Sequence, residues 1–99
     1  MGKVNTIRTT DQVHEWLSKL KDRKGLAIIS ARIAAAETGN FGDCGPVGEG
    51  VSEMRIHFGP GYRIYFTQLG SVVYVLLCGG TKATQTRDIV KAKRMVKDL

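Results

Sequence analysis

The chain has little cysteine and little proline. Its 99 residues include two cysteines and two prolines, with no CxxC motif and no Cys/His cluster. This scarcity excludes a disulfide-stapled secreted scaffold and fits a reducing cytoplasm, where we expect the protein to act. The two histidines, His14 and His57, are not at metal-ligand spacing. We therefore expect no metal site and no cofactor.

Long hydrophobic runs are also missing. No apolar run approaches the roughly 20 residues that a membrane helix requires, and no secretory leader opens the sequence. The longest apolar run, residues 72–78, has the length of a strand. Hydrophobic residues make up 42% and charged residues 24% of the chain, which is typical of a globular protein. We expect a single domain over residues 1–99, complete in itself, with no membrane contact.

Positive charge is in excess and is unevenly placed. The net charge is +6, and residues 82–99 carry six basic and two acidic side chains. A basic end of this kind indicates a nucleic acid, an acidic protein partner or a solvated helix surface. Composition does not choose among the three.

Hydrophobic periodicity predicts the N-terminal half. Residues 3–8 alternate and predict a short strand, after which Thr9 or Thr10 can cap a helix. An apolar stripe at helical spacing follows, made of Val13, Trp16, Leu17 and Leu20. Gly25 is expected to break this helix, and residues 26–37 to form a second helix that ends at Gly39.

The C-terminal half reads as a sheet followed by one helix. Residues 40–50 are rich in glycine, but no Lys-Ser/Thr pair follows, so a Walker A loop is excluded. We expect a short strand near residues 44–47, then strands at 51–58, 62–68 and 72–78, with the last the most central and Gly79-Gly80 ending the sheet. A helix should begin near Thr84 or Gln85, with a buried stripe formed by Ile89, Ala92, Val96 and Leu99.

The predicted fold is therefore α+β. An N-terminal strand and a helical hairpin precede a mostly antiparallel sheet, and a C-terminal helix follows it.

Polar side chains gather on one predicted sheet face. Arg55 and His57 lie two apart on one strand, and Arg63 and Tyr65 lie two apart on its antiparallel neighbour. Lys82 follows the next strand. Arginine can bind two phosphate oxygens, and histidine can move a proton near neutral pH, so the set suits a phosphodiester. Antiparallel sheets often have one solvated face, however, so an ordinary exposed surface stays open as an alternative.

The sequence resembles the RelE/ParE toxin superfamily, and more closely its addiction module killer proteins, near the HigB toxins. The resemblance covers nearly the whole chain and is carried by GNFGD at residues 39–43, VGEGVSEMRI at 47–56, GPGYRIYF at 59–66 and LLCGGTK at 76–82. It implies a RelE-like fold and a bacterial type II toxin with a cognate helix-turn-helix antitoxin. The complex of toxin and antitoxin commonly represses its own operon, so contact with operator DNA would be indirect, through the antitoxin.

Two activities follow from the resemblance. RelE-like members cut mRNA in the ribosomal A site without a metal and leave a cyclic phosphate, which would make this protein a metal-independent endoribonuclease. ParE-like members inhibit DNA gyrase and lack the nuclease residues. We expect the nuclease and keep the alternative of a gyrase-type inhibitor or an inactive relic that only binds its antitoxin.

The resemblance also implies roles for individual residues. Arg55 and His57 match positions that contact RNA and assist proton transfer, Arg63 matches the arginine on the scissile phosphate, and Lys82 holds the basic position after the last strand. The residues expected to bind RNA are Arg55, Arg63, Tyr65, Lys82, Thr84 and Gln85. Where the best-known RelE pattern has a tyrosine, this chain has Asp88 and Ile89. His57 is therefore the first candidate for the general base and Tyr65 the second.

Overall fold

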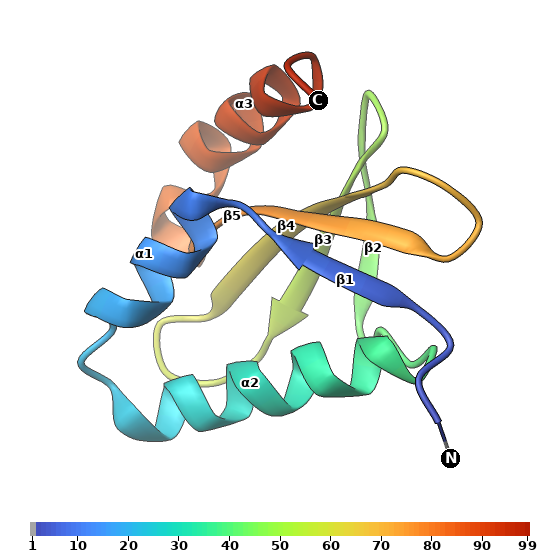
Figure 1. The fold of residues 1–99 in the computed structure, drawn as a ribbon. Coiled ribbons are helices and arrows are strands. Elements are labelled where there is room, and N and C mark those ends of the chain that lie inside the picture. The colour runs from blue at the N-terminus through green and yellow to red at the C-terminus, as the bar shows by residue number, and fades with distance from the viewer. Residues whose placement is uncertain (1) are drawn as a thin grey trace.

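One mixed sheet with helices on both faces makes up the fold (Figure 1). The structure is a computed structural model that describes residues 2–99. Along those residues the elements are β1 (Thr6–Thr9), α1 (Asp11–Lys19), α2 (Arg23–Glu37), β2 (Cys44–Gly48), β3 (Val51–Ile56), β4 (Tyr62–Gln68), β5 (Val73–Thr81), a 3-10 turn (Lys82–Thr84) and α3 (Gln85–Val96). The predicted α+β class, with a helical hairpin before the sheet and a helix after it, is confirmed.

The strands lie in the order β1-β5-β4-β3-β2. The β1–β5 pair is parallel and the other three pairs are antiparallel, so the expectation of a mostly antiparallel sheet is confirmed. The central strand is β4, and the prediction that residues 72–78 form the most central strand is wrong. β5 has apolar residues on both of its faces because helices cover both faces of the sheet, and β4 is covered in the same way.

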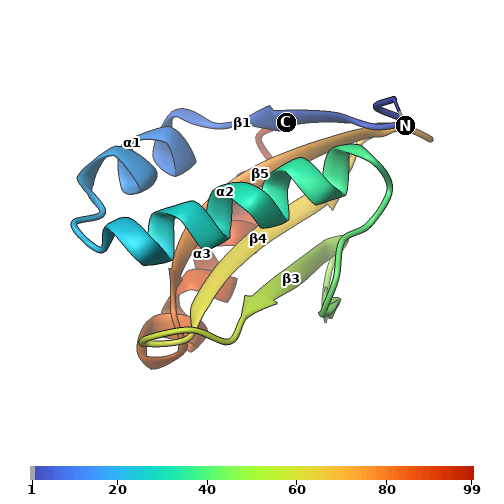
Figure 2. The ribbon, with the colours of Figure 1, turned by 90° about the horizontal axis from the view of Figure 1, so that it is seen from below.

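Each face of the sheet has its own hydrophobic core. On one face, α1 and α2 pack Val13, Ile29 and Ala36 against the sheet. On the other face, α3 packs Ala92 against Val51, Tyr65 and Leu77. Figure 2 shows α2 lying across the sheet with α3 behind it. The sheet is therefore a middle layer, and no whole face of it is open to solvent.

The break between α1 and α2 lies earlier than predicted. Thr10 caps α1 by accepting a hydrogen bond from the backbone of Val13, as expected, but α1 ends at Lys19. Asp22 caps α2 by accepting from the backbone N–H of Gly25, at 2.9 Å, so Gly25 lies inside the first turn of α2. A Cβ on Gly25 would lie 2.7 Å from Cε2 of Tyr62. The glycine allows close packing on β4 and does not break a helix.

The pair Gly79-Gly80 does not end the sheet, because β5 continues to Thr81. A Cβ on Gly79 would collide with the ring of Trp16, and one on Gly80 with the carboxylate of Asp88. Both glycines let helices approach the sheet from opposite faces. At the end of α3, Leu99 is 57% exposed, so its predicted burial is wrong.

None of the helices within residues 2–99 has the length and hydrophobicity needed to cross a bilayer.

Candidate functional site

The candidate site lies where β3 ends, β4 begins and β5 ends. Arg55 of β3 pairs with Arg63 of β4, and Tyr62 pairs with Thr81, so these strand ends lie side by side. The backbone N–H of Lys82 donates to the carbonyl of Gly61 at 2.8 Å. We call Arg55, His57, Arg63 and Lys82 the sheet-end cluster. The structure brings these predicted residues to one end of the sheet.

His57 lies just beyond β3, in the turn to β4, and its side chain is 68% exposed. Its Nε2 is 2.6 Å from Oδ2 of Asp43. The other carboxylate oxygen of Asp43 accepts a hydrogen bond from Nη1 of Arg55 at 2.9 Å. A carboxylate on one ring nitrogen fixes the orientation and tautomer of an imidazole, leaving the other nitrogen for a proton transfer.

Hydrogen bonds from His57 and then from Arg55 lower the pKa of Asp43 below its ordinary value of 3.8. The Asp43 and Glu53 carboxylates in turn raise the pKa of Arg55. Asp43 is therefore ionised throughout the range where histidine titrates. The exposed end of the cluster combines a fixed anion, a permanent cation and a titratable ring.

The loop that carries Asp43 is held by Arg32 of α2. Nη1 of Arg32 donates to the carbonyl of Arg55 at 2.7 Å, and Nη2 donates to the carbonyls of Phe41 and Asp43 at 3.0 and 3.2 Å. One guanidinium thus joins the loop to β3. This contact sets where the Asp43 side chain meets His57.

The inner part of the cluster is buried, and the prediction that this sheet face is exposed is wrong. Glu53 is 2% and Arg63 7% exposed because α3 covers them. Glu53 accepts from Nε of Arg55 at 3.0 Å and from Nε2 of Gln85 at 2.6 Å, and lies 3.9 Å from Nε of Arg63. Arg63 and Gln85, expected to contact RNA, instead surround a buried carboxylate.

Tyr65 is fully buried in the core beneath α3. Burial, and then the nearby charge of Glu53, raise the pKa of its phenol far above its ordinary value. A buried neutral phenol neither contacts RNA nor serves as a base near neutral pH. In this conformation, Tyr65 is therefore excluded both as an RNA contact and as the second candidate for the general base.

Lys82 and Thr84, both in the 3-10 turn after β5, differ in what they can reach. Lys82 is exposed, whereas the hydroxyl of Thr84 donates to Oδ2 of Asp88 at 2.5 Å. Thr84 occupies the N-cap position of α3, as predicted, but its side chain does not cap the helix. Asp88 is buried against Gly80 and ties the start of α3 to β5.

Within residues 2–99, no three or more His, Cys, Asp and Glu side chains gather as metal ligands would. Both cysteines in this range are free thiols. Burial raises the pKa of Cys78 from its ordinary 9.0 to about 11, so this thiol is uncharged at neutral pH and is a poor nucleophile.

Sequence reasoning missed Asp43, Glu53 and Arg32 as parts of the site. Asp43 stood in the GNFGD motif that carries the family resemblance, and this was the one sequence feature that could have singled it out. Glu53 shares its strand face with Arg55, but alternation alone does not show that this part of the face is covered. For Arg32 the helix pattern gave no indication of a role.

A comparison with known proteins places the chain beside a protein of Haemophilus influenzae that is itself uncharacterized. The two are 46% identical over 93 residues, which cover 94% of this chain and 94% of the relative. The chain belongs to the same family. No family model matches the sequence, and no solved structure matches it. This membership assigns no activity.

Proposed function

We propose that this protein is a toxin of a bacterial type II toxin–antitoxin system, a member of the RelE/ParE superfamily near the HigB toxins with a RelE-like fold. Its activity is the cleavage of mRNA on the ribosome in the cytoplasm, without a metal, until a cognate helix-turn-helix antitoxin neutralises it. The observation that carries the proposal is an exposed His57 held by Asp43 beside Arg55, with Lys82 and Arg63 at the same end of the sheet.

The chemistry needs no nucleophile from the protein, because RNA carries its own 2′-hydroxyl. His57 takes the proton of this hydroxyl, whose oxygen then attacks the neighbouring phosphorus. The bond from phosphorus to the 5′-oxygen breaks, leaving a 2′,3′-cyclic phosphate, and the departing oxygen takes up a proton from solvent water. Arg55 and Lys82 stabilise the charge that builds on the phosphate oxygens.

Arg63 enters the proposal differently from the exposed residues. It is nine-tenths buried beside Glu53, and Gln85 of α3 is bonded to the same carboxylate. Contact between Arg63 and a phosphate requires the first turn of α3 to move aside. Without that movement, Arg63 contributes only its charge, 3.9 Å from the Glu53 carboxylate that bonds Arg55.

The test is induction of wild-type and variant proteins in bacteria, followed by primer extension on cellular transcripts. We expect His57→Ala and Arg63→Ala to relieve growth inhibition and to abolish ribosome-linked cuts. His14→Ala is a matched control, because His14 is exposed on α1 far along the chain from the cluster. Since Arg63 is buried, thermal unfolding and antitoxin binding are measured for its variant. If folded His57→Ala and Arg63→Ala proteins both remain fully toxic, the assigned site is wrong.

The pairing of Arg63 with Glu53 favours a second candidate, a non-nuclease toxin that inhibits gyrase or an inactive relic. An arginine neutralised beneath α3 is not available to RNA. The same experiment separates the candidates. Intact transcripts with DNA damage support gyrase inhibition, whereas intact transcripts with normal growth support a relic.

A further inference from the structure

Arg63 is a buried charge with few partners. Its guanidinium stays charged and carries five N–H donors. Nη1 donates to the carbonyl of Tyr62 at 3.4 Å, while Nε has no hydrogen-bond partner among residues 2–99 and lies 3.9 Å from Oε2 of Glu53. A buried charge that is bonded this weakly destabilises the structure that buries it. Any conformation that exposes the guanidinium to water or to an anion relieves this cost.

The Glu53 oxygen that lies beside Arg63 is bonded by α3 instead. Oε2 of Glu53 accepts a hydrogen bond from Nε2 of Gln85 at 2.6 Å, and Oε1 accepts from Nε of Arg55 at 3.0 Å. Gln85 is the first residue of α3. Its side chain therefore fastens the start of the helix to β3, next to Arg63.

Apart from this bond, little holds the first turn of α3, residues 85–88. The buried residue of this turn is Asp88, and apolar packing begins only at Ile89 and Ala92. Thr84 donates its hydroxyl to Asp88 and does not cap the helix. The helix is the last element and joins the sheet through one short 3-10 turn (Figure 1). Because segments with few buried apolar contacts open at low free energy, this turn can move while the core stays folded.

The covered guanidinium lies next to the exposed cations of the sheet-end cluster. A Cβ on Gly61 would lie 3.8 Å from Nη1 of Arg63 and 3.3 Å from Cβ of Lys82, so both side chains flank this glycine. Arg55 is bonded to the same carboxylate that lies beside Arg63. Opening the first turn of α3 would therefore add a third cation to this end of the sheet. A planar guanidinium beside two other cations suits a phosphate, whose oxygens it can bind two at a time.

We infer that the first turn of α3 is a lid, latched by Gln85 on Glu53, that opens to present Arg63 to a phosphate group. A phosphate that binds only the open form shifts the lid toward that form. Gln85 then acts as a gating residue and not as an RNA contact. Under the proposed function the phosphate is an RNA phosphodiester, and the inference rests on that function for this identity alone.

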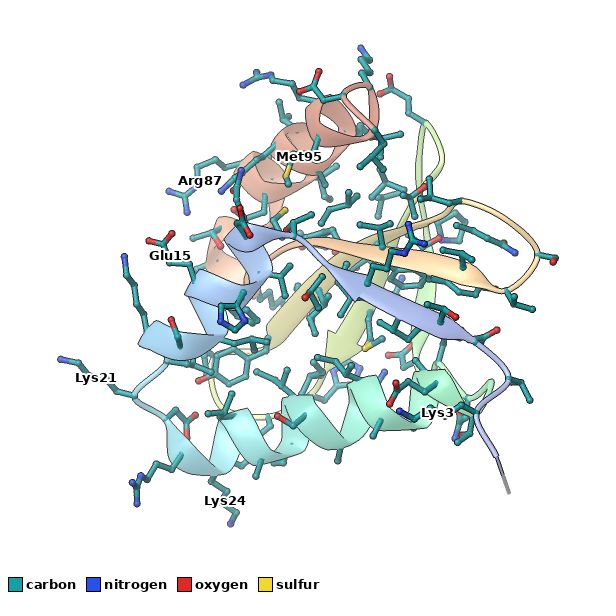
Figure 3. The ribbon with its side chains drawn as sticks, viewed as in Figure 1. Lys3, Glu15, Lys21, Lys24, Arg87 and Met95 are labelled. Atoms are coloured by element: carbon teal, nitrogen blue, oxygen red, sulfur yellow. The ribbon has the colours of Figure 1, made fainter. Side chains whose placement is uncertain are left out.

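The test measures how fast phenylglyoxal, an arginine reagent, modifies Arg63 in the full chain, with peptide mass spectrometry as the readout. The reagent reaches Arg63 in the open form, so the rate follows the open population. We expect Gln85→Ala to raise this rate at least tenfold, or about 1.4 kcal/mol. Arg87, whose side chain is 77% exposed and projects outward from α3 (Figure 3), is the internal reference and should react equally in both proteins.

The matched control is Gln68→Ala, at the other end of β4. Gln68 is exposed and also makes one side-chain hydrogen bond, to the carbonyl of Ser71, so its loss should leave the Arg63 rate within twofold. Thermal unfolding checks that both variants are folded. The inference is overturned if Arg63 in Gln85→Ala reacts at the wild-type rate, or if Gln68→Ala accelerates it as much.

A second arm of the experiment identifies the ligand. A short 2′-O-methyl RNA, which carries phosphodiesters but has no free 2′-hydroxyl for cleavage, should slow the modification of Arg63 in Gln85→Ala. The same oligonucleotide with uncharged methylphosphonate linkages should not. Equal protection by both, or protection by neither, overturns the assignment of Arg63 to a phosphate. Cleavage is not measured, so a failed latch is distinguishable from a failed nuclease.

Discussion

At the scale of single residues, Asp43 connects the exposed and buried parts of the cluster. It bonds His57 through one oxygen and Arg55 through the other, and Arg55 in turn bonds the buried Glu53. The Asp43 carboxylate therefore contacts the His57 ring directly and is linked to the buried Glu53 through the Arg55 guanidinium. Any role of His57 in proton transfer should depend on this carboxylate.

Replacing Asp43 with asparagine tests this dependence. Asp43→Asn keeps the size of the side chain but removes the anion, so we expect RNA cleavage to fall about tenfold to a hundredfold while the fold is kept. Because the lowered pKa of Asp43 keeps it ionised above its ordinary 3.8, wild-type cleavage should not lose this contact between pH 5 and 8. The variant should show a displaced pH–rate profile over that range.

Asp11→Asn, on an exposed residue at the start of α1, is the control for loss of one negative charge. If Asp43→Asn cleaves at the wild-type rate with an unchanged pH profile, Asp43 has no positioning role.

At the scale of elements, the first turn of α2 packs closely on β4 because residue 25 is a glycine. An alanine at Gly25 would favour the helix by about 1 kcal/mol through propensity. Its Cβ would however lie 2.5 Å from Oδ2 of Asp22 and 2.7 Å from the ring of Tyr62, and such overpacking typically costs about 1–3 kcal/mol. The clash should prevail.

We therefore expect Gly25→Ala to lower the free energy of unfolding by up to about 2 kcal/mol in urea denaturation, the balance of the two effects. Ser30→Ala, at an exposed position of the same helix, should be neutral or slightly stabilising. A stabilised Gly25→Ala protein would mean that the close contacts with Asp22 and Tyr62 are relieved at little cost.

Some features of the helices and strands could be predicted from the sequence, and others could not. Strict alternation located β3 and β4, and side-chain chemistry located the Thr10 cap, because both effects are local. The apolar stripe of α3 showed that this helix is covered, but a stripe does not say which sheet face covers it. Arg63 and Tyr65 were therefore expected in solvent. Asp43 lies in a loop, where no periodicity points to a partner.

At the scale of the whole molecule, the buried Cys78 thiol and Tyr65 phenol make the free energy of unfolding depend on pH in the alkaline range. Burial raises the pKa of Cys78 from 9.0 to about 11 and that of Tyr65 above 10.0. A raised pKa means that the unfolded chain loses these protons first. Stability is therefore full below about pH 9 and falls as pH rises through the folded pKa of each group.

Chemical denaturation at a series of pH values measures this effect. We expect the free energy of unfolding to decline between pH 9 and 11, with a shallower decline in Tyr65→Phe and in Cys78→Ala. Tyr65→Phe should also fold well, because the hydroxyl that it removes has no hydrogen-bond partner in the structure. Equal slopes in the wild type and both variants would show that neither group is responsible.

The parallel pairing of β1 with β5 has a consequence for biosynthesis. Thr6 pairs with Val73, and the hydroxyl of Thr10 bonds the carbonyl of Leu77 across 67 positions. β1 is translated before the other four strands but can take its place in the sheet only after β5 has been made. Closing so long a connection is slow compared with forming the β3–β4 hairpin. The nascent chain should therefore complete its sheet at the N-terminal edge last, against the direction of synthesis.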